Sequence, residues 1–83
     1  MIFLELSDAV KQRILGLCSQ RQITVNKLSI ICGITQSSLN NIINGASLDP
    51  KISTIKKVCD GLEITLAQFF DCDEFNNLEQ ELK

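Results

Sequence analysis

The stretch LSIICGITQSSLNNIING, residues 28–45, decides the fold expected for this chain. Its apolar residues recur at helical spacing, but Gly33, Ile34 and Thr35 interrupt the pattern with a turn. Glycine suits the left-handed backbone that often follows a helix, and threonine is a good N-cap for the next one. We therefore expect two short helices joined at this turn, the second stopped by Asn44-Gly45.

The helix expected after Thr35 has two unlike faces. On a helical wheel that advances about 100° per residue, five uncharged polar side chains share an arc of about 140°: Gln36, Ser37, Asn40, Asn41 and Asn44. The apolar residues Leu39, Ile42 and Ile43 lie outside this arc. Amides donate and accept, as bidentate pairing to a base edge requires, whereas hydroxyls and a helix N-terminus suit phosphate oxygens. The polar face alone is equally compatible with a solvated surface that binds nothing.

Further helices follow from capping residues and apolar spacing. Helices are expected after Ser7, fading near Arg21, after Thr24, and from about Ile52. Thr65 and Gln68 form a capping box that opens another. The apolar positions that these helices turn inward are Val10, Ile14, Leu17, Cys18, Val25, Leu28, Ile31, Cys32, Ile55, Val58, Cys59, Leu62, Leu66, Phe69 and Phe70. We expect an all-α fold of five short helices, in one domain because the chain has only 83 residues.

The charges are unevenly distributed along the chain. The formal net charge is −2, but residues 21–59 carry five basic residues against Asp49, a net charge of +4. Residues 60–83 carry seven acidic residues against one lysine, a net charge of −6. The overall acidity therefore belongs to the C-terminal third, and the segment with the polar helix is basic.

The four cysteines do not have the spacing of a metal site. No two of them are closer than 13 positions, and the chain has no histidine, so zinc is not expected. Buried free thiols in Cys18, Cys32 and Cys59 fit a reducing cytoplasm. For Cys72, the neighbours Asp71 and Asp73 are expected to raise the thiol pKa, which argues against a redox role. We expect no signal peptide, membrane span, cofactor or catalytic site.

Residues 24–70 resemble the phage-repressor-type, Cro-like helix-turn-helix domain of the XRE family, which is commonest in bacteria and their phages. The segments VNKLSIICGITQSSLNNIING (25–45) and ISTIKKVCDGLEITLAQFF (52–70) carry the resemblance. It implies a lambda-repressor-like domain over residues 1–70, with the helix-turn-helix at about 24–44. It also implies that the helix after Thr35 enters the major groove of duplex DNA, in a protein that is usually a dimer.

The resemblance assigns roles to individual side chains. It implies that Gln36, Ser37 and Asn41 read bases, with Asn40 as a further contributor. The residues implied to bind phosphate are Thr35, Ser38, Asn44, Lys27 and Lys51. For the two lysines, a solvated position without a ligand fits the sequence equally well.

Three positions depart from the family pattern. Val25 replaces a glutamine that braces the DNA backbone in many members, which weakens the DNA inference. Gly61 stands where alanine is common, at a cost of about 1 kcal/mol. Glu63 replaces the usual turn glycine. The last two are expected to affect stability only.

The acidic residues 71–83 leave a second function open. Phe75, Leu78 and Leu82 are spaced for a weak apolar stripe, which permits a helix that contacts a second copy or a partner protein, as in an antitoxin. A solvated, frayed end is the alternative. We expect a sequence-specific transcriptional regulator, a homodimeric repressor that associates through its fifth helix and this tail.

Overall fold

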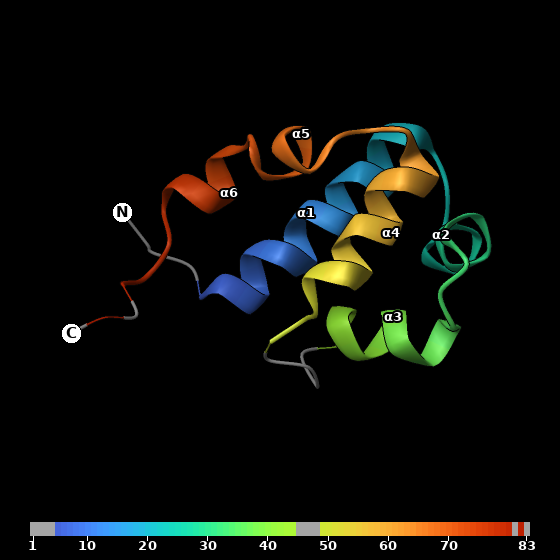
Figure 1. The fold of residues 1–83 in the computed structure, drawn as a ribbon, viewed down its shortest axis with the longest axis horizontal. Coiled ribbons are helices and arrows are strands. Elements are labelled where there is room, and N and C mark those ends of the chain that lie inside the picture. Colours follow the sequence, from blue (N-terminus) through green and yellow to red (C-terminus); the bar gives the residue numbers. More distant parts are fainter. Residues whose placement is uncertain (1–4, 45–48, 81, 83) are drawn as a thin grey trace.

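The computed structural model describes residues 5–44, 49–80 and 82, and this part of the chain is helical throughout its regular structure (Figure 1). The helices are α1 (Leu6–Arg21), α2 (Val25–Cys32), α3 (Gln36–Ile43), α4 (Ile52–Leu62), α5 (Leu66–Phe70) and α6 (Asp73–Asn76). The all-α class is confirmed. The described residues contain one helix more than expected, because the short α6 follows the five expected from the sequence.

The start of α1 differs from the expectation. The expected N-cap, Ser7, lies inside the first turn, and the N-cap is Glu5, whose carbonyl oxygen accepts a hydrogen bond from the Ala9 N–H at 3.0 Å. A serine cap is worth about 1 kcal/mol, and here it does not outweigh additional helical hydrogen bonds at the N-terminal end. The other end, at Arg21, is as expected.

Local capping defines the turn between α2 and α3. The Thr24 hydroxyl accepts from the Lys27 N–H at 3.0 Å and caps α2. α2 ends at Cys32, and its C-cap is Gly33, with a φ of 67°. Thr35 caps α3 in the same way. α3 ends at Ile43, with Asn44 as its C-cap, and Gly45 lies outside the described residues.

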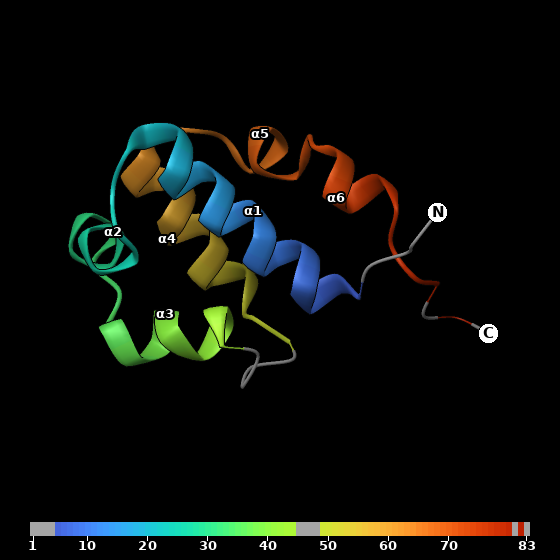
Figure 2. The ribbon, with the colours of Figure 1, turned by 180° about the vertical axis from the view of Figure 1, so that it is seen from behind.

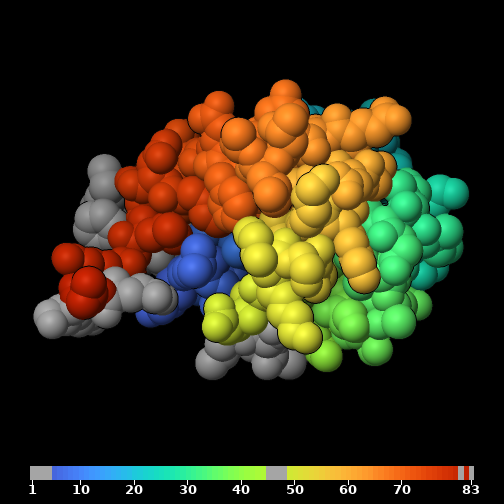
Figure 3. All heavy atoms as spheres, viewed as in Figure 1, coloured from blue at the N-terminus to red at the C-terminus, as the bar shows by residue number. Residues whose placement is uncertain are grey.

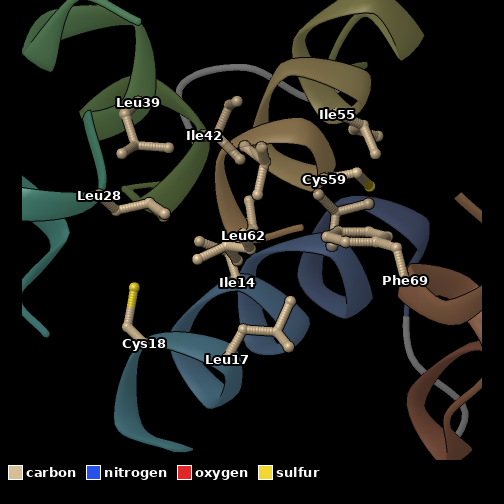
Figure 4. Close-up of a cluster of buried hydrophobic side chains, with 12 residues drawn as sticks. Ile14, Leu17, Cys18, Leu28, Leu39, Ile42, Ile55, Cys59, Leu62 and Phe69 are labelled. Carbon is tan, nitrogen blue, oxygen red and sulfur yellow. The ribbon is translucent and has the colours of Figure 1, made fainter. Parts of the chain in front are cut away.

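The core is built from the inner sides of α1 to α5 (Figure 4). Leu39 and Ile42 anchor α3 in it, and Leu28 anchors α2. Ile31, expected inside, is instead 41% exposed, because α2 turns Leu28 inward and leaves Ile31 near the edge of its buried side. The fully or nearly fully buried apolar residues are Ala9, Val10, Ile14, Leu17, Cys18, Leu28, Leu39, Ile42, Ile55, Val58, Cys59, Leu62 and Phe69.

Among the described residues, α2 and α4 are the pair of helices with the most extensive contact. A Cβ atom at Gly61 would lie 2.5 Å from the Cys32 sulfur and 3.0 Å from the Cys32 Cα. The Cys32 thiol also donates a long hydrogen bond to the Val58 carbonyl oxygen at 3.7 Å. Gly61 is therefore not only a weak helix former, as its sequence position indicates, but a packing requirement of this helix pair.

α5 and α6 lie on the opposite side of α1 from α3 (Figures 1 and 2). The capping box of Thr65 and Gln68 is present at the start of α5. At its other end, Arg13 of α1 donates from Nε to the Phe69 carbonyl oxygen and from Nη2 to that of Gln68, each at 2.7 Å. This guanidinium joins the N-terminal helix to a segment more than 50 residues away in sequence.

Three phenylalanines form an aromatic cluster beside α1. The rings of Phe70 and Phe75 meet edge to face with centroids 4.8 Å apart, and Phe69 lies 5.0 Å from Phe70. α6 itself packs against α1. Residues 73–76 thus belong to the packed structure, whereas Leu82, the last apolar residue of the expected stripe, is 82% exposed.

Replacing Gly61 by alanine is expected to destabilise the domain by about 1–3 kcal/mol, because the clash with Cys32 exceeds the gain in helix propensity. The same change at Gly16, where a Cβ would meet nothing within 4 Å, should stabilise it by up to about 1 kcal/mol. Urea unfolding of both variants measures the difference. In a Cys32→Ala background, the loss of unfolding free energy caused by Gly61→Ala should shrink by at least about 0.5 kcal/mol. An unchanged loss would refute the contact between Gly61 and Cys32.

Replacing Arg13 by alanine is expected to lower the free energy of unfolding by about 1–3 kcal/mol, because two charge-assisted hydrogen bonds are lost. Arg21→Ala, at the exposed last turn of α1, is the matched control and should cost less than about 1 kcal/mol. Chemical denaturation compares the two. If both variants lost the same free energy of unfolding, the hydrogen bonds from Arg13 to α5 would make no stabilising contribution of their own.

Candidate nucleic-acid interface

The outer face of α3 presents the polar side chains that the sequence places there. Gln36, Ser37 and Asn41 are exposed, and Asn40 is half-buried. Because Leu39 and Ile42 bury the opposite side, the face is presented by an anchored helix and not by a loop. The helix itself has no charged residue. It can therefore donate to and accept from a partner through amides and hydroxyls alone.

The hydroxyls at the start of α3 form a short chain of hydrogen bonds. The Thr35 Oγ1 accepts from the Ser38 N–H at 3.2 Å and donates to the Ser38 Oγ at 2.8 Å. The proton of Thr35 is thus used inside the cap. The proton of Ser38 remains available to an acceptor outside, such as a phosphate oxygen.

A hollow of about 280 Å³ separates α3 from the start of α4. Figure 3 shows these two segments side by side along the lower part of the molecule. Both helices contribute to the lining, which consists of Ser38, Asn41, Ile42, Asp49, Pro50, Lys51 and Thr54. Three residues predicted to contact DNA, Ser38 and Asn41 of α3 and the α4 N-cap Lys51, are therefore brought together.

Other predicted residues lie outside this hollow. Lys27 is exposed in the first turn of α2, and Gln36 and Ser37 are in the first turn of α3. Asn44 is exposed at the C-cap, where its N–H bonds to the Asn40 carbonyl oxygen at 2.8 Å. The sequence does not identify Asp49 and Thr54 as neighbours of α3. Helical periodicity does not indicate which residues from other parts of the chain pack beside a given helix.

Comparison with known proteins agrees with this geometry. Residues 13–74 match the profile of the Cro/C1-type HTH DNA-binding domain, where HTH stands for helix-turn-helix. The chain belongs to this family. The structure also resembles the crystal structure of the prophage Lp1 protein 11, with a TM-score of 0.79 and 32% identity, over 92% of this chain and all of that one.

Two Bacillus subtilis (strain 168) proteins are similar in sequence to this Cro/C1-type domain. The HTH-type transcriptional regulator SlrR is 32% identical over 62 residues, which is 74% of this chain and 41% of SlrR. The HTH-type transcriptional repressor RghR is 34% identical over 57 residues, which is 69% of this chain and 42% of RghR. The chain thus spans about two-fifths of the length of these relatives. The family is defined by DNA binding and not by catalysis, as the sequence predicts.

The departures from the family pattern have structural counterparts in this Cro/C1-type domain. Val25 is half-buried and packs against the core, so its side chain is apolar support for α2. Glu63 adopts the left-handed conformation at the end of α4, with a φ of 59°, where glycine would be unstrained. Neither residue lies on α3.

Lys51 and three acidic residues near the C-terminus lie on different parts of the domain. Lys51 lines the hollow beside α3, and the exposed pair Lys56–Asp60 is an ion pair one helical turn long on α4. The acidic Asp71, Asp73 and Glu74 lie in and next to α5 and α6, on the opposite side of α1 from α3. These three acidic residues therefore do not lie beside α3, although Asp49 does.

All four cysteines of the Cro/C1-type domain are free thiols, with Cys18 and Cys59 buried and Cys32 half-buried. Burial raises the pKa of each of these three thiols. The pKa of Cys72 is raised as expected, but the causes are burial first and then Glu74, and not the adjacent Asp71 and Asp73. Within residues 5–44, 49–80 and 82, no three potential ligands gather around a metal position, and no helix has the length and apolar character to cross a membrane.

The free energy of unfolding is expected to be constant near neutral pH and to fall as the pH rises past 9.0, the ordinary pKa of these thiols. The thiols ionise more easily in the unfolded chain, because burial raises their pKa in the folded one. Each contributes a slope of at most about 1.4 kcal/mol per pH unit. Urea titrations under reducing conditions measure the fall, and Cys59→Ala should make it less steep; an identical slope would refute the assignment.

Proposed function

We propose that this domain is a sequence-specific regulator of transcription that binds duplex DNA with α3 in the major groove. The observation that carries the proposal is the anchored polar face of α3, with Leu39 and Ile42 in the core and Gln36, Ser37 and Asn41 exposed. A rigid helix with amide side chains suits base edges, because each amide offers a donor and an acceptor in fixed geometry. Membership of a DNA-binding family supports the same reading.

The side chains divide into two groups in this proposal. Gln36, Ser37 and Asn41 read base edges, and the half-buried Asn40 contributes from the side of the groove. The remaining residues of the proposed interface bind phosphates: Thr35, Ser38, Asn44, Lys27 and Lys51. Among these, Ser38 and Lys51 have the strongest support, because both line the hollow between α3 and α4 and the Ser38 hydroxyl has a proton to donate.

We propose further that the protein is a homodimeric repressor that associates through α5 and the C-terminal residues. RghR, one of the similar proteins, is named a transcriptional repressor, which supports repression and not activation. The half-buried rings of Phe70 and Phe75 supply apolar surface at that end of the molecule, away from α3. Such a regulator would act in the cytoplasm, where duplex DNA and reduced thiols occur together.

Selection from a pool of random duplex DNA, followed by sequencing of the bound fraction, tests the proposal. We expect enrichment of an inverted repeat whose half-sites lie about one helical turn apart. A single enriched half-site would support base reading and refute the dimer. A pool that stays unenriched at low salt would refute sequence-specific DNA binding and favour a protein partner for this face.

Gln36→Ala and Asn41→Ala are each expected to weaken binding to the enriched duplex by about 1–3 kcal/mol, with little change on a scrambled duplex. Gln20→Ala, an exposed amide near the end of α1 and outside both proposed interfaces, is the matched control and should change neither affinity. Fluorescence anisotropy with labelled duplexes measures both. Equal losses on the two duplexes would assign these amides to phosphate contacts.

A further inference from the structure

Asp49 occupies an unexpected place for an acidic residue. It is the sole acidic residue between positions 21 and 59, yet it lines the hollow together with Ser38, Asn41 and Lys51. A surface that binds a polyanion gains affinity from positive charge and loses it from negative charge. The position of this carboxylate beside the base-reading helix therefore requires an explanation other than phosphate binding.

In the part of the chain that the structure describes, the carboxylate of Asp49 is not in an ion pair. Among residues 5–44, 49–80 and 82, the ion pair is between Lys56 and Asp60, so Lys51 does not neutralise its neighbour in the hollow. Asp49 is also exposed. Its oxygens are thus available to a donor that approaches α3 from outside.

Duplex DNA offers such a donor only on its bases. Phosphate oxygens are acceptors, and an ionised carboxylate is an acceptor too, so the two repel and cannot share a hydrogen bond. In the major groove, the exocyclic amino groups of cytosine and adenine are donors, and aspartate pairs with the cytosine N4 amino group. Asn41, which lines the same hollow, suits adenine through its own donor and acceptor.

We propose that Asp49 is a specificity-determining residue that accepts a hydrogen bond from a cytosine amino group next to the base read by Asn41. On duplexes that lack this cytosine, the carboxylate meets no donor and is repelled by the phosphates. Asp49 therefore lowers affinity for the wrong sequences more than for the right one. This inference rests on the proposed function of α3 as a base-reading helix.

Asp49→Asn tests the proposal, because it removes the charge while keeping the shape. We expect the variant to bind a scrambled duplex more tightly, and its ratio of affinities for the enriched and scrambled duplexes to fall at least about fivefold. Glu63→Gln at the end of α4 is the matched control: it removes a negative charge outside the hollow and outside the proposed dimer contact, and should leave the ratio unchanged. Anisotropy titrations at one fixed salt concentration measure all three proteins.

A second selection, with Asp49→Ala on random duplex DNA, identifies the base, because alanine has no oxygen to accept a hydrogen bond from cytosine. We expect one position in each half-site to lose its preference for cytosine while the other positions keep theirs. An unchanged sequence preference, or tighter binding to both duplexes by the same factor, would overturn the role of Asp49. Absence of any preference in the unsubstituted protein would instead overturn the proposed function itself, so the two failures are distinguishable.

Discussion

The contact between Cys32 and Gly61 is the constraint on which the position of α3 depends. α3 follows α2 after a turn of three residues, Gly33 to Thr35, whose helix-capping hydrogen bonds leave little freedom. The direction of α2 therefore sets the direction of α3. α2 in turn packs so closely against α4 that position 61 has no room for a side chain. A wider spacing of α2 and α4 would shift the whole polar face relative to the core.

Short-range features of the fold are readable from the sequence because both partners lie within a few residues. The caps at Thr24, Thr35 and Thr65 and the helix end at Gly33 are examples. Ser7 shows the limit of this reasoning, since a favourable cap does not fix a helix start when neighbouring residues also form helix. The Arg13 bonds to the end of α5 and the packing of α6 on α1 depend on tertiary structure, which no local pattern specifies.

The candidate interface was predictable to the extent that it lies on one helix. The wheel of α3 places Gln36, Ser37 and Asn41 together, and the structure exposes all three. Asp49 and Thr54 join Ser38 and Asn41 only through the path of the chain between α3 and α4, which periodicity does not describe. The charge count likewise located the basic segment, but the placement of Asp71, Asp73 and Glu74 away from α3 is a property of the fold.

The aromatic cluster of Phe69, Phe70 and Phe75 gives the domain an internal reporter. The chain has neither tryptophan nor tyrosine, and three of its four phenylalanines gather here, away from α3. Edge-to-face rings shift the NMR frequencies of nearby protons only while they stay packed. One spectrum can therefore separate two kinds of defective variant: a misfolded one loses these displaced resonances, and a folded one with a damaged interface keeps them.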